Sequence, residues 1–341
     1  MAPRLAEMSS PQLSGRIVVA LPTLASGRYI RRSLGQMVPE LRALATGRQV
    51  TLAACLNGPD PDGQHLEALR EALDAVRDGI PGLDTHVLVR AEPGKNAALG
   101  DLVGYARSID AAYFMVIDDD VVFEPGTLGR NIDALAQAPT DRVVVVGARI
   151  LTPVRPLRSF LKRQAGPAGV LAWWWQSVFR LPYEPASEFF LFTPGPCSAM
   201  RVGDYPELPS DESGITDDAY INYWVVAERG LILQPPGSVV YFQVASGYRE
   251  WIRQQLRVLA GIETTLALFK DDADEIRRVF AWAYSHNKEA RVPAVCRTPR
   301  RLVLLCAYRL AQEDLLRRYR KLAGTPDWGR AESTKDTDFS A

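Results

Sequence analysis

The sequence predicts an α/β fold with a mostly parallel, Rossmann-like central sheet, helices on both of its faces, and a helical C-terminal extension. Two features of the first 150 residues predict the sheet: short runs alternate with amphipathic segments, and the runs are almost continuously apolar. Strand-helix alternation is typical of parallel sheets, and continuous apolarity is typical of strands buried on both faces. A third feature, long helical patterns after residue 247, predicts the extension.

The predicted elements follow in chain order. Five apolar runs predict strands at 17–21, 50–56, 85–89, 113–117 and 143–147, and leucines at helical spacing predict a helix within 65–77. Residues 153–209 are rich in Pro, Gly and aromatic residues, which favours a covering region rather than sheet core. A helix at 217–229, short strands at 231–234 and 239–242, and helices at about 248–270, 272–285 and 299–322 complete the chain.

Composition and length bound the organisation of the chain. We expect a flexible N-terminus at 1–14, a catalytic domain at 15–247 with halves at 15–150 and 151–247, a helical region at 248–323, and a disordered tail at 324–341. The 40 basic and 40 acidic residues balance, which gives no reason to expect a nucleic-acid partner. We find no signal peptide or membrane-spanning run, so we expect a cytoplasmic protein, with peripheral contact at the inner membrane face left open.

The strongest chemical pattern is the acidic triplet after the strand at 113–117. Asp118, Asp119 and Asp120 end an apolar run, where three carboxylates repel one another unless a cation is present. The first and third side chains of an extended segment point the same way. Asp118 and Asp120 are therefore candidate ligands for Mg²⁺ or Mn²⁺, which can bridge a diphosphate. A solvated acidic turn that caps the next helix is the alternative.

Two loops add candidate binding residues. Lys95 begins a helix after a Pro-Gly turn, where its positive charge opposes the helix dipole. This favours a nearby anion such as a nucleotide phosphate. An ordinary exposed lysine is the alternative. Asn57, Asp60 and Asp62 lie in a loop rich in Pro and Gly, where short polar side chains suit a base or ribose. Taken alone, that loop favours plain turn chemistry.

Two later patterns are ambiguous in the same way. Asp217 and Asp218 follow Thr216, so the pair either begins a helix capped by Thr216 or supplies a general base whose pKa is shifted by its neighbour. Arg253 and Arg257 continue a stripe of arginines along one helix face, which would be relieved either by a bound anion or by surface acids elsewhere in the fold.

In this order the segments resemble glycosyltransferase family 2, the inverting nucleotide-sugar enzymes of the GT-A fold, over roughly residues 17–258. ALPTLASGRYIRRSL looks like the family's opening strand and helix, and NGPDPDG, GKNAAL and the DDD triplet look like its acidic loop, its Gly-Lys segment and its Asp-x-Asp motif. TPGPCSAMR looks like its acceptor-side segment, in which a glycine turn precedes a strand ending in an arginine, here Arg201. TDD and QQLRV look like its Thr-Glu-Asp and Gln-x-x-Arg-Trp motifs. The sequence departs from the family at two positions. Asn57 replaces an acid that recognises uracil, and Val258 replaces a tryptophan typical of processive synthases. We therefore expect transfer of a single sugar.

The resemblance implies roles for individual residues. Asp218, or else Asp217, would be the general base, and Asp118 and Asp120 would hold the metal. The donor, with a UDP-sugar favoured, would bind through Pro22, Asn57, Asp60, Asp62, Lys95, Asp118, Asp119, Arg253, Gln254 and Arg257. The acceptor, a hydroxyl or amine of a small molecule, glycan or lipid, would meet Gly195. Trp174 and Trp175 are acceptor candidates on a different ground, because aromatic rings in the covering region could stack on a sugar.

Several alternatives stay open. Packing within the covering region is favoured over acceptor contact for the tryptophans, and solvation is favoured over an anionic lipid surface for the basic C-terminal helix. A nucleotidyltransferase would carry a Gly-rich loop after the first strand, where LPTLASG has one glycine. A membrane-surface lipid-phosphate glycosyl synthase and a non-catalytic nucleotide-binding scaffold remain as alternative functions.

Overall fold

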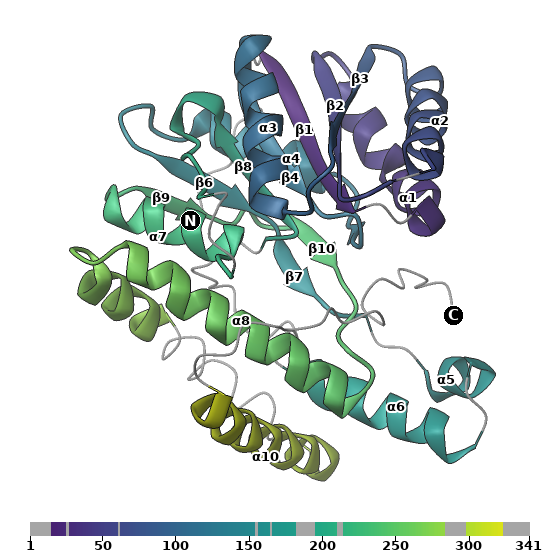
Figure 1. Cartoon of the computed structure of the whole chain (residues 1–341), viewed down its shortest axis with the longest axis vertical. Helices are drawn as coiled ribbons and strands as arrows, with labels where there is room; N and C mark the ends of the chain where they lie inside the picture. The colour runs from purple at the N-terminus through teal and green to yellow at the C-terminus, as the bar shows by residue number, and fades with distance from the viewer. Residues whose placement is uncertain are drawn as a thin grey trace, which may run out of the picture.

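The computed structural model describes residues 15–24, 27–60, 62–153, 156–163, 166–181, 195–209, 214–283 and 298–322. The predicted flexible N-terminus and disordered tail lie outside these residues. The fold is α/β, with a mostly parallel seven-stranded sheet flanked by helices and a helical C-terminal part, as the sequence predicts (Figure 1).

The first half of the chain builds most of the sheet. Its elements are β1 (Arg16–Leu24), α1 (Gly27–Ala45), β2 (Val50–Asn57), α2 (Gln64–Asp78), β3 (Leu83–Arg90), α3 (Lys95–Ser108), β4 (Ala111–Ile117), β5 (Val122–Phe123), α4 (Thr127–Gln137), β6 (Val144–Gly147) and β7 (Arg149–Leu151). All five strands expected from apolar runs are present. The run of β1 is continuous because that strand is buried on both faces: Ile17, Val19 and Leu21 pack on one side, and Val18 and Ala20 pack on the other. β3, at the edge of the sheet, is less buried.

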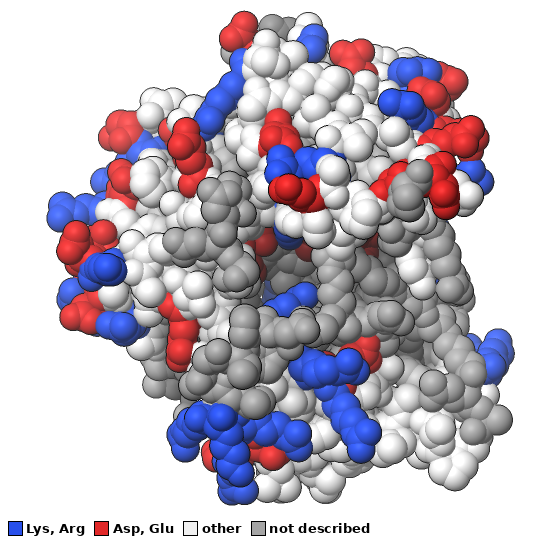
Figure 2. Space-filling model, viewed as in Figure 1, with Lys and Arg blue, Asp and Glu red and all other residues white. Residues whose placement is uncertain are grey.

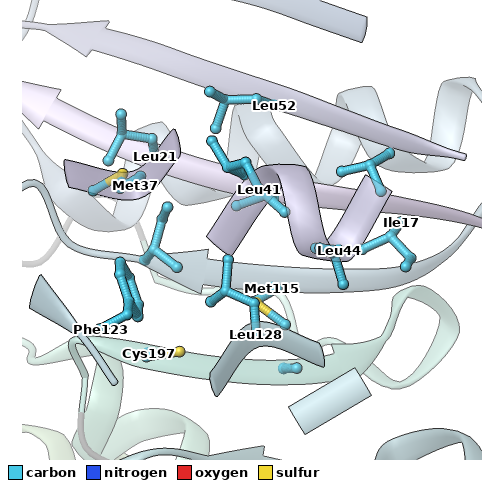
Figure 3. Close-up of a cluster of buried hydrophobic side chains, with 14 of the residues drawn as sticks. Ile17, Leu21, Met37, Leu41, Leu44, Leu52, Met115, Phe123, Leu128 and Cys197 are labelled. Carbon is cyan, nitrogen blue, oxygen red and sulfur yellow. The ribbon is translucent and has the colours of Figure 1, made fainter. Parts of the chain in front are cut away.

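One layer of this core lies between the sheet and α1. Figure 3 shows strand residues Ile17, Leu21, Leu52 and Met115 against Met37, Leu41 and Leu44 of α1, with Phe123, Leu128 and Cys197 completing the cluster. The layer on the opposite face is built from α3 and α7. Two packed layers hold the strands rigid, so the loops at their carboxyl ends are held in fixed positions.

The second half of the chain inserts into the same sheet. Its elements are α5 (Leu157–Arg163), α6 (Pro167–Phe179), β8 (Cys197–Arg201), a 3₁₀ turn (Val202–Asp204), α7 (Asp217–Ala227), β9 (Leu231–Leu233), β10 (Val239–Tyr241), α8 (Tyr248–Leu268), a helix at 273–283 and α10 (Pro299–Leu322). The strand order is β3-β2-β1-β4-β8-β6-β9, and a small sheet has the order β5-β10-β7.

The composition of residues 153–209 favours a covering region, and this is wrong for β8, whereas the strand ending at Arg201 that the family resemblance implies is present. This strand lies between β4 and β6 and is antiparallel to both. Its small residues, Cys197, Ser198 and Ala199, fill narrow buried space without forming an apolar run, so the pattern of a central strand is missing from the sequence. The rest of the segment matches the expectation better, because α5 and α6 lie outside the sheet (Figure 1).

The C-terminal helices form a separate layer beneath the sheet. α8 packs against α7, and α6, α8 and α10 share an apolar cluster that includes Phe179, Trp251 and Leu304. Within the described part of the chain, no helix combines the length and apolarity needed to cross a bilayer.

Candidate functional site

Three charged residues from distant parts of the sequence meet at the carboxyl edge of the parallel strands. Lys95 is the first residue of α3, Asp118 directly follows β4, and Asp217 is the first residue of α7. The Lys95 Nζ atom lies 2.8 Å from Asp118 Oδ1 and 3.0 Å from Asp217 Oδ2. The edge where parallel strands end is where ligands bind in open α/β sheets, so this triad is the centre of the candidate site.

The triad is partly withdrawn from water, with side chains 32% exposed at Lys95, 23% at Asp118 and 13% at Asp217. The pKa of Asp118 is raised to about 6, chiefly by burial; Lys95 opposes this rise, and Asp120 and Asp217 add to it. Burial lowers the pKa of Lys95, but Asp118 and Asp217 outweigh this and hold it well above its ordinary value. Lys95 is therefore a permanent cation between two carboxylates.

Asp218 lies beside the triad in the first turn of α7. Its Oδ1 accepts a hydrogen bond of 2.8 Å from the Ala219 backbone N–H. Burial raises its pKa, and the neighbouring charge of Asp217 raises it further. Gly195 packs directly on it, since a Cβ there would lie 3.2 Å from the Asp218 Cβ and 3.4 Å from Oδ2. A carboxylate with a raised pKa in a close-packed position is a candidate proton acceptor.

Thr216 occupies the N-cap position of α7, as one interpretation of the sequence expects, but its side chain makes no capping hydrogen bond. Its backbone N–H instead donates to Thr265 Oγ1 of α8 at 3.2 Å. The two acidic residues of the first turn still match the positive end of the helix dipole. The start of α7 is thus fixed by α8 rather than by its own cap.

The triplet itself is tied to three other segments. Asp119 Oδ2 accepts a hydrogen bond of 2.8 Å from Thr23 Oγ1 at the end of β1, and the Asp119 carbonyl accepts one from Ser33 in α1. The Asp118 backbone N–H donates to the Pro196 carbonyl at 3.1 Å. Asp119, which the resemblance assigns to the donor, therefore also anchors the acidic turn, and Pro22 is buried within β1 next to this anchor.

The loop after β2 uses its polar side chains on the backbone. The buried Asn57 donates through Nδ2 to the Thr23 carbonyl at 2.8 Å and accepts through Oδ1 from the Gly94 N–H at 3.2 Å. Asp60 accepts from the backbone N–H groups of His65 and Leu66, which orders the start of α2. These contacts match the turn interpretation, whereas Asp62 is exposed in the loop. A donor-binding role for the three residues stays a prediction.

Asp118 and Asp120 fit a divalent cation that arrives with a diphosphate better than one held by the protein alone. The two carboxylates are close enough for Asp120 to raise the pKa of Asp118. In the described residues, however, no group of three or more His, Cys, Asp or Glu side chains could hold a metal ion. Mg²⁺ commonly takes one or two carboxylates and completes its shell with water and substrate phosphate oxygens. The donor set present here suits that arrangement.

α8 runs past the site on the side of α7. A Cβ at Gly261 would lie 2.5 Å from Thr216 Cγ2 and 2.9 Å from the Gly214 carbonyl, so the two helices touch there. Gln254 and Arg257 precede Gly261 by seven and four residues and thus share its helix face. Arg257 and Arg253 are exposed, and Gln254 is partly buried. Figure 2 shows the surface hollowed between the sheet and the C-terminal helices, with acidic and basic atoms visible inside.

The predicted acceptor tryptophans lie elsewhere, on α6. Trp174 and Trp175 pack against the cluster shared with α8 and α10. The Trp175 ring lies 4.9 Å from the Tyr248 ring and 5.3 Å from the Phe179 ring, measured between centroids. This matches the packing interpretation, and acceptor contact for the pair stays a prediction.

Two further residues at this site, Asn96 and Tyr205, are not among the site residues predicted from the sequence. Asn96 Nδ2 donates to the carbonyls of Pro209 and Ile215 at 3.4 and 3.3 Å, so it ties the start of α3 to the chain that leads into α7. Its place beside Lys95 was the available signal. Tyr205 is buried under the site, with its pKa raised beyond the usual tyrosine range by burial and by Asp217. Nothing in the sequence around it indicates this position.

No protein-family model matches this sequence, and no curated protein sequence matches it. Among solved structures, the chain is similar to one described as "Crystal Structure of a Mycobacterial Protein", at 14% identity and a TM-score of 0.35. The match covers 67% of this chain and 65% of that chain, so it spans less than two-thirds of that structure's length. A likeness this distant carries no argument about function.

Proposed function

We propose that this protein is an inverting glycosyltransferase that moves one sugar from a nucleotide-diphosphate sugar to an acceptor hydroxyl or amine. The observation that carries the proposal is the contact of Lys95 with both Asp118 and Asp217. Lys95 and Asp118, which the sequence assigns to the donor and metal, and Asp217, which it assigns to the general-base pair, meet within hydrogen-bonding distance at a sheet edge suited to ligands.

The donor side of the reaction needs positive charge near the leaving diphosphate. Lys95 holds its proton and lies at the N-terminus of α3, where free backbone N–H groups also favour anions. Arg257 and Gln254 share the face of α8 that reaches the start of α7. A divalent cation carried on Asp118 and Asp120 would offset charge on the leaving group.

The acceptor side needs a base. Asp218 would accept the acceptor proton while the acceptor oxygen or nitrogen bonds to the anomeric carbon and the bond from that carbon to the diphosphate oxygen breaks. The nucleoside diphosphate leaves with the bonding electrons. Because the acceptor attacks the anomeric carbon in one step from the side opposite the diphosphate, the configuration inverts and no protein nucleophile is needed. Because its pKa is raised, Asp218 would lose its proton at higher pH than an ordinary aspartate. We therefore expect turnover to rise with pH through that pKa.

The test is consumption of a panel of nucleotide sugars with Mg²⁺ or Mn²⁺, followed by nuclear magnetic resonance with and without simple sugar acceptors. We expect release of one nucleoside diphosphate and a product of inverted anomeric configuration. Asp218→Asn should retain nucleotide binding and lose at least about a hundredfold in rate, the scale of a general base. If the unmodified protein binds a nucleotide sugar but releases no nucleoside diphosphate from it, the non-catalytic scaffold is favoured instead.

The membrane-surface lipid-phosphate synthase shares this chemistry and differs in its acceptor. One observation favours it as a second candidate: α10 presents apolar and basic side chains together on its outer surface. A lipid-phosphate acceptor that outcompetes soluble sugars in the same assay would select this candidate.

A further inference from the structure

The helix α10 is apolar on two opposite sides. Leu304, Ala311 and Leu315, at spacings of seven and four, face inward and join the cluster shared with α6 and α8. Leu302, Val303 and Leu310 face outward, with Leu310 72% exposed. An ordinary surface helix buries one apolar stripe and exposes a polar one, so the outer stripe of α10 is not required by the packing of this fold.

Exposed apolar side chains are also present on α6, which packs against α10. The Arg300 guanidinium lies 5.1 Å from the centroid of the Trp173 ring, which places the first turn of α10 beside the middle of α6. Val170 is one turn before Trp173 and is exposed, as is Leu171. Figure 1 shows α6 and α10 together along the lower edge of the molecule, on the far side of α8 from the sheet. We name this surface, made of Val170, Leu171, Leu302, Val303 and Leu310, the α6–α10 face.

Positive charge surrounds the α6–α10 face. α10 carries seven basic residues and two acidic ones, and the basic residues include Arg309, Arg317 and Arg320 on its exposed side. One of the two acids, Asp314, is already engaged by Arg318 at 2.8 Å and by the Tyr248 hydroxyl at 2.5 Å. Figure 2 shows the resulting basic cluster at the lower edge.

We infer that the α6–α10 face binds the surface of an anionic lipid membrane, with its aliphatic side chains at the level of the acyl chains and its arginines at the phosphates. Interfacial helices combine these two features, and each basic residue near an anionic surface adds to the attraction. A second copy of this chain fits less well, because a two-fold interface would bring two α10 helices with the same positive charge together. This inference does not depend on the proposed function.

The test is sedimentation of the full chain with vesicles of phosphatidylcholine alone, or with about one-third phosphatidylglycerol. We expect binding to the anionic vesicles, at least about tenfold weaker binding to the neutral ones, and loss at high salt, which screens the charges. Val303→Glu should weaken binding about tenfold or more, since it removes an exposed valine that would enter the membrane and adds a negative charge that the anionic lipids repel. Val89→Glu is the matched control, because Val89 on β3 is 55% exposed and Val303 is 54% exposed; it should bind as the unmodified protein does.

A second measurement keeps the test decisive if Val303→Glu does not fold. Cys306 lies on the exposed side of α10, while Cys55 and Cys197 are buried. Cys296→Ser removes the fourth cysteine of the chain, so that labelling is directed to Cys306. The emission of a polarity-sensitive fluorophore on Cys306 should then shift to the blue when anionic vesicles are added. Failure of the unmodified chain to bind these vesicles, an unshifted fluorophore, or equal losses in the two glutamate variants would overturn the inference. So would a dimer, detected by light scattering, that Val303→Glu dissociates.

Discussion

Replacing Asp118 by Asn should make the protein more stable at neutral pH while removing metal-dependent nucleotide binding. The folded-state pKa of Asp118 is about 6, above its ordinary value of 3.8, chiefly because the carboxyl group is buried. Folding therefore favours the protonated acid. The free energy of unfolding contributed by this group is highest below pH 4 and falls as the pH rises to about 6.

The size of the effect follows from that pKa difference. Full ionisation of Asp118 above pH 6 costs the folded protein about 3 kcal/mol. Because 23% of the side chain is exposed, water screens part of this, and we expect about 2 kcal/mol. Asn resembles the protonated acid and carries no charge at any pH. Asp118→Asn should thus match the original protein near pH 4 and exceed it by about 2 kcal/mol at pH 7.5, or about 3 °C in melting temperature for a chain of this length.

Urea titrations of both proteins at pH 4, 5.5 and 7.5 measure this difference directly. Asp78→Asn, at an exposed carboxylate of α2, is the control and should change stability by no more than about 0.5 kcal/mol at any of these pH values. If Asp118→Asn is less stable than the original protein at pH 7.5, the attraction to Lys95 exceeds the cost of burial. The electrostatic description of the triad would then be wrong.

Three further substitutions probe the packing around the site. Gly261→Ala places a Cβ 2.5 Å from the Thr216 methyl group at the start of α7 and should lower the free energy of unfolding by about 1–2 kcal/mol. Gly203→Ala is the control, because the space around Gly203 is open. Thermal melts of the two variants should show a loss of stability for Gly261→Ala alone. Gly195→Ala crowds Asp218 at 3.2 Å and should lower kcat about tenfold with the melting temperature nearly unchanged; an unchanged kcat would argue against Asp218 as the base. Asn57→Asp loses its donor to the Thr23 carbonyl once it is ionised, so its free energy of unfolding, measured by urea titration, should fall by about 1–3 kcal/mol between pH 4 and pH 8. Equal free energies of unfolding at the two pH values would exclude a structural role for this hydrogen bond.

The strands of the sheet could be predicted because their burial on both faces leaves a direct mark on the sequence. Each of β1, β2 and β4 is an almost unbroken apolar run. β8 leaves no such mark. Its position is set by backbone hydrogen bonds to β4 and β6, and these depend little on side-chain type. Sequence periodicity therefore located the parallel strands and missed the antiparallel one between them.

The candidate site was predictable in its charges and not in its contacts. Acidic residues after a buried strand indicate a cation whatever their partner is. The partner of Asp118 is Lys95, which also contacts Asp217. These contacts depend on how α3 and α7 pack, which the sequence does not reveal. In the loop after β2, the residue types alone do not distinguish ligand binding from turn formation. Asn57 and Asp60 are residue types that suit both a ligand and a turn, and here they hydrogen-bond the backbone.

The most direct test of the donor site is calorimetric titration of the protein with UDP, GDP, CDP and dTDP, each with and without Mn²⁺, repeated on Asp120→Ala. We expect one nucleotide to bind with a strong dependence on the metal, and Asp120→Ala to lose that dependence while keeping its fold. The nucleotide that binds would also define the base preference at Asn57. If no nucleotide binds with Mn²⁺ present, Lys95, Asp118 and Asp217 form a structural ion pair, and the glycosyltransferase proposal fails.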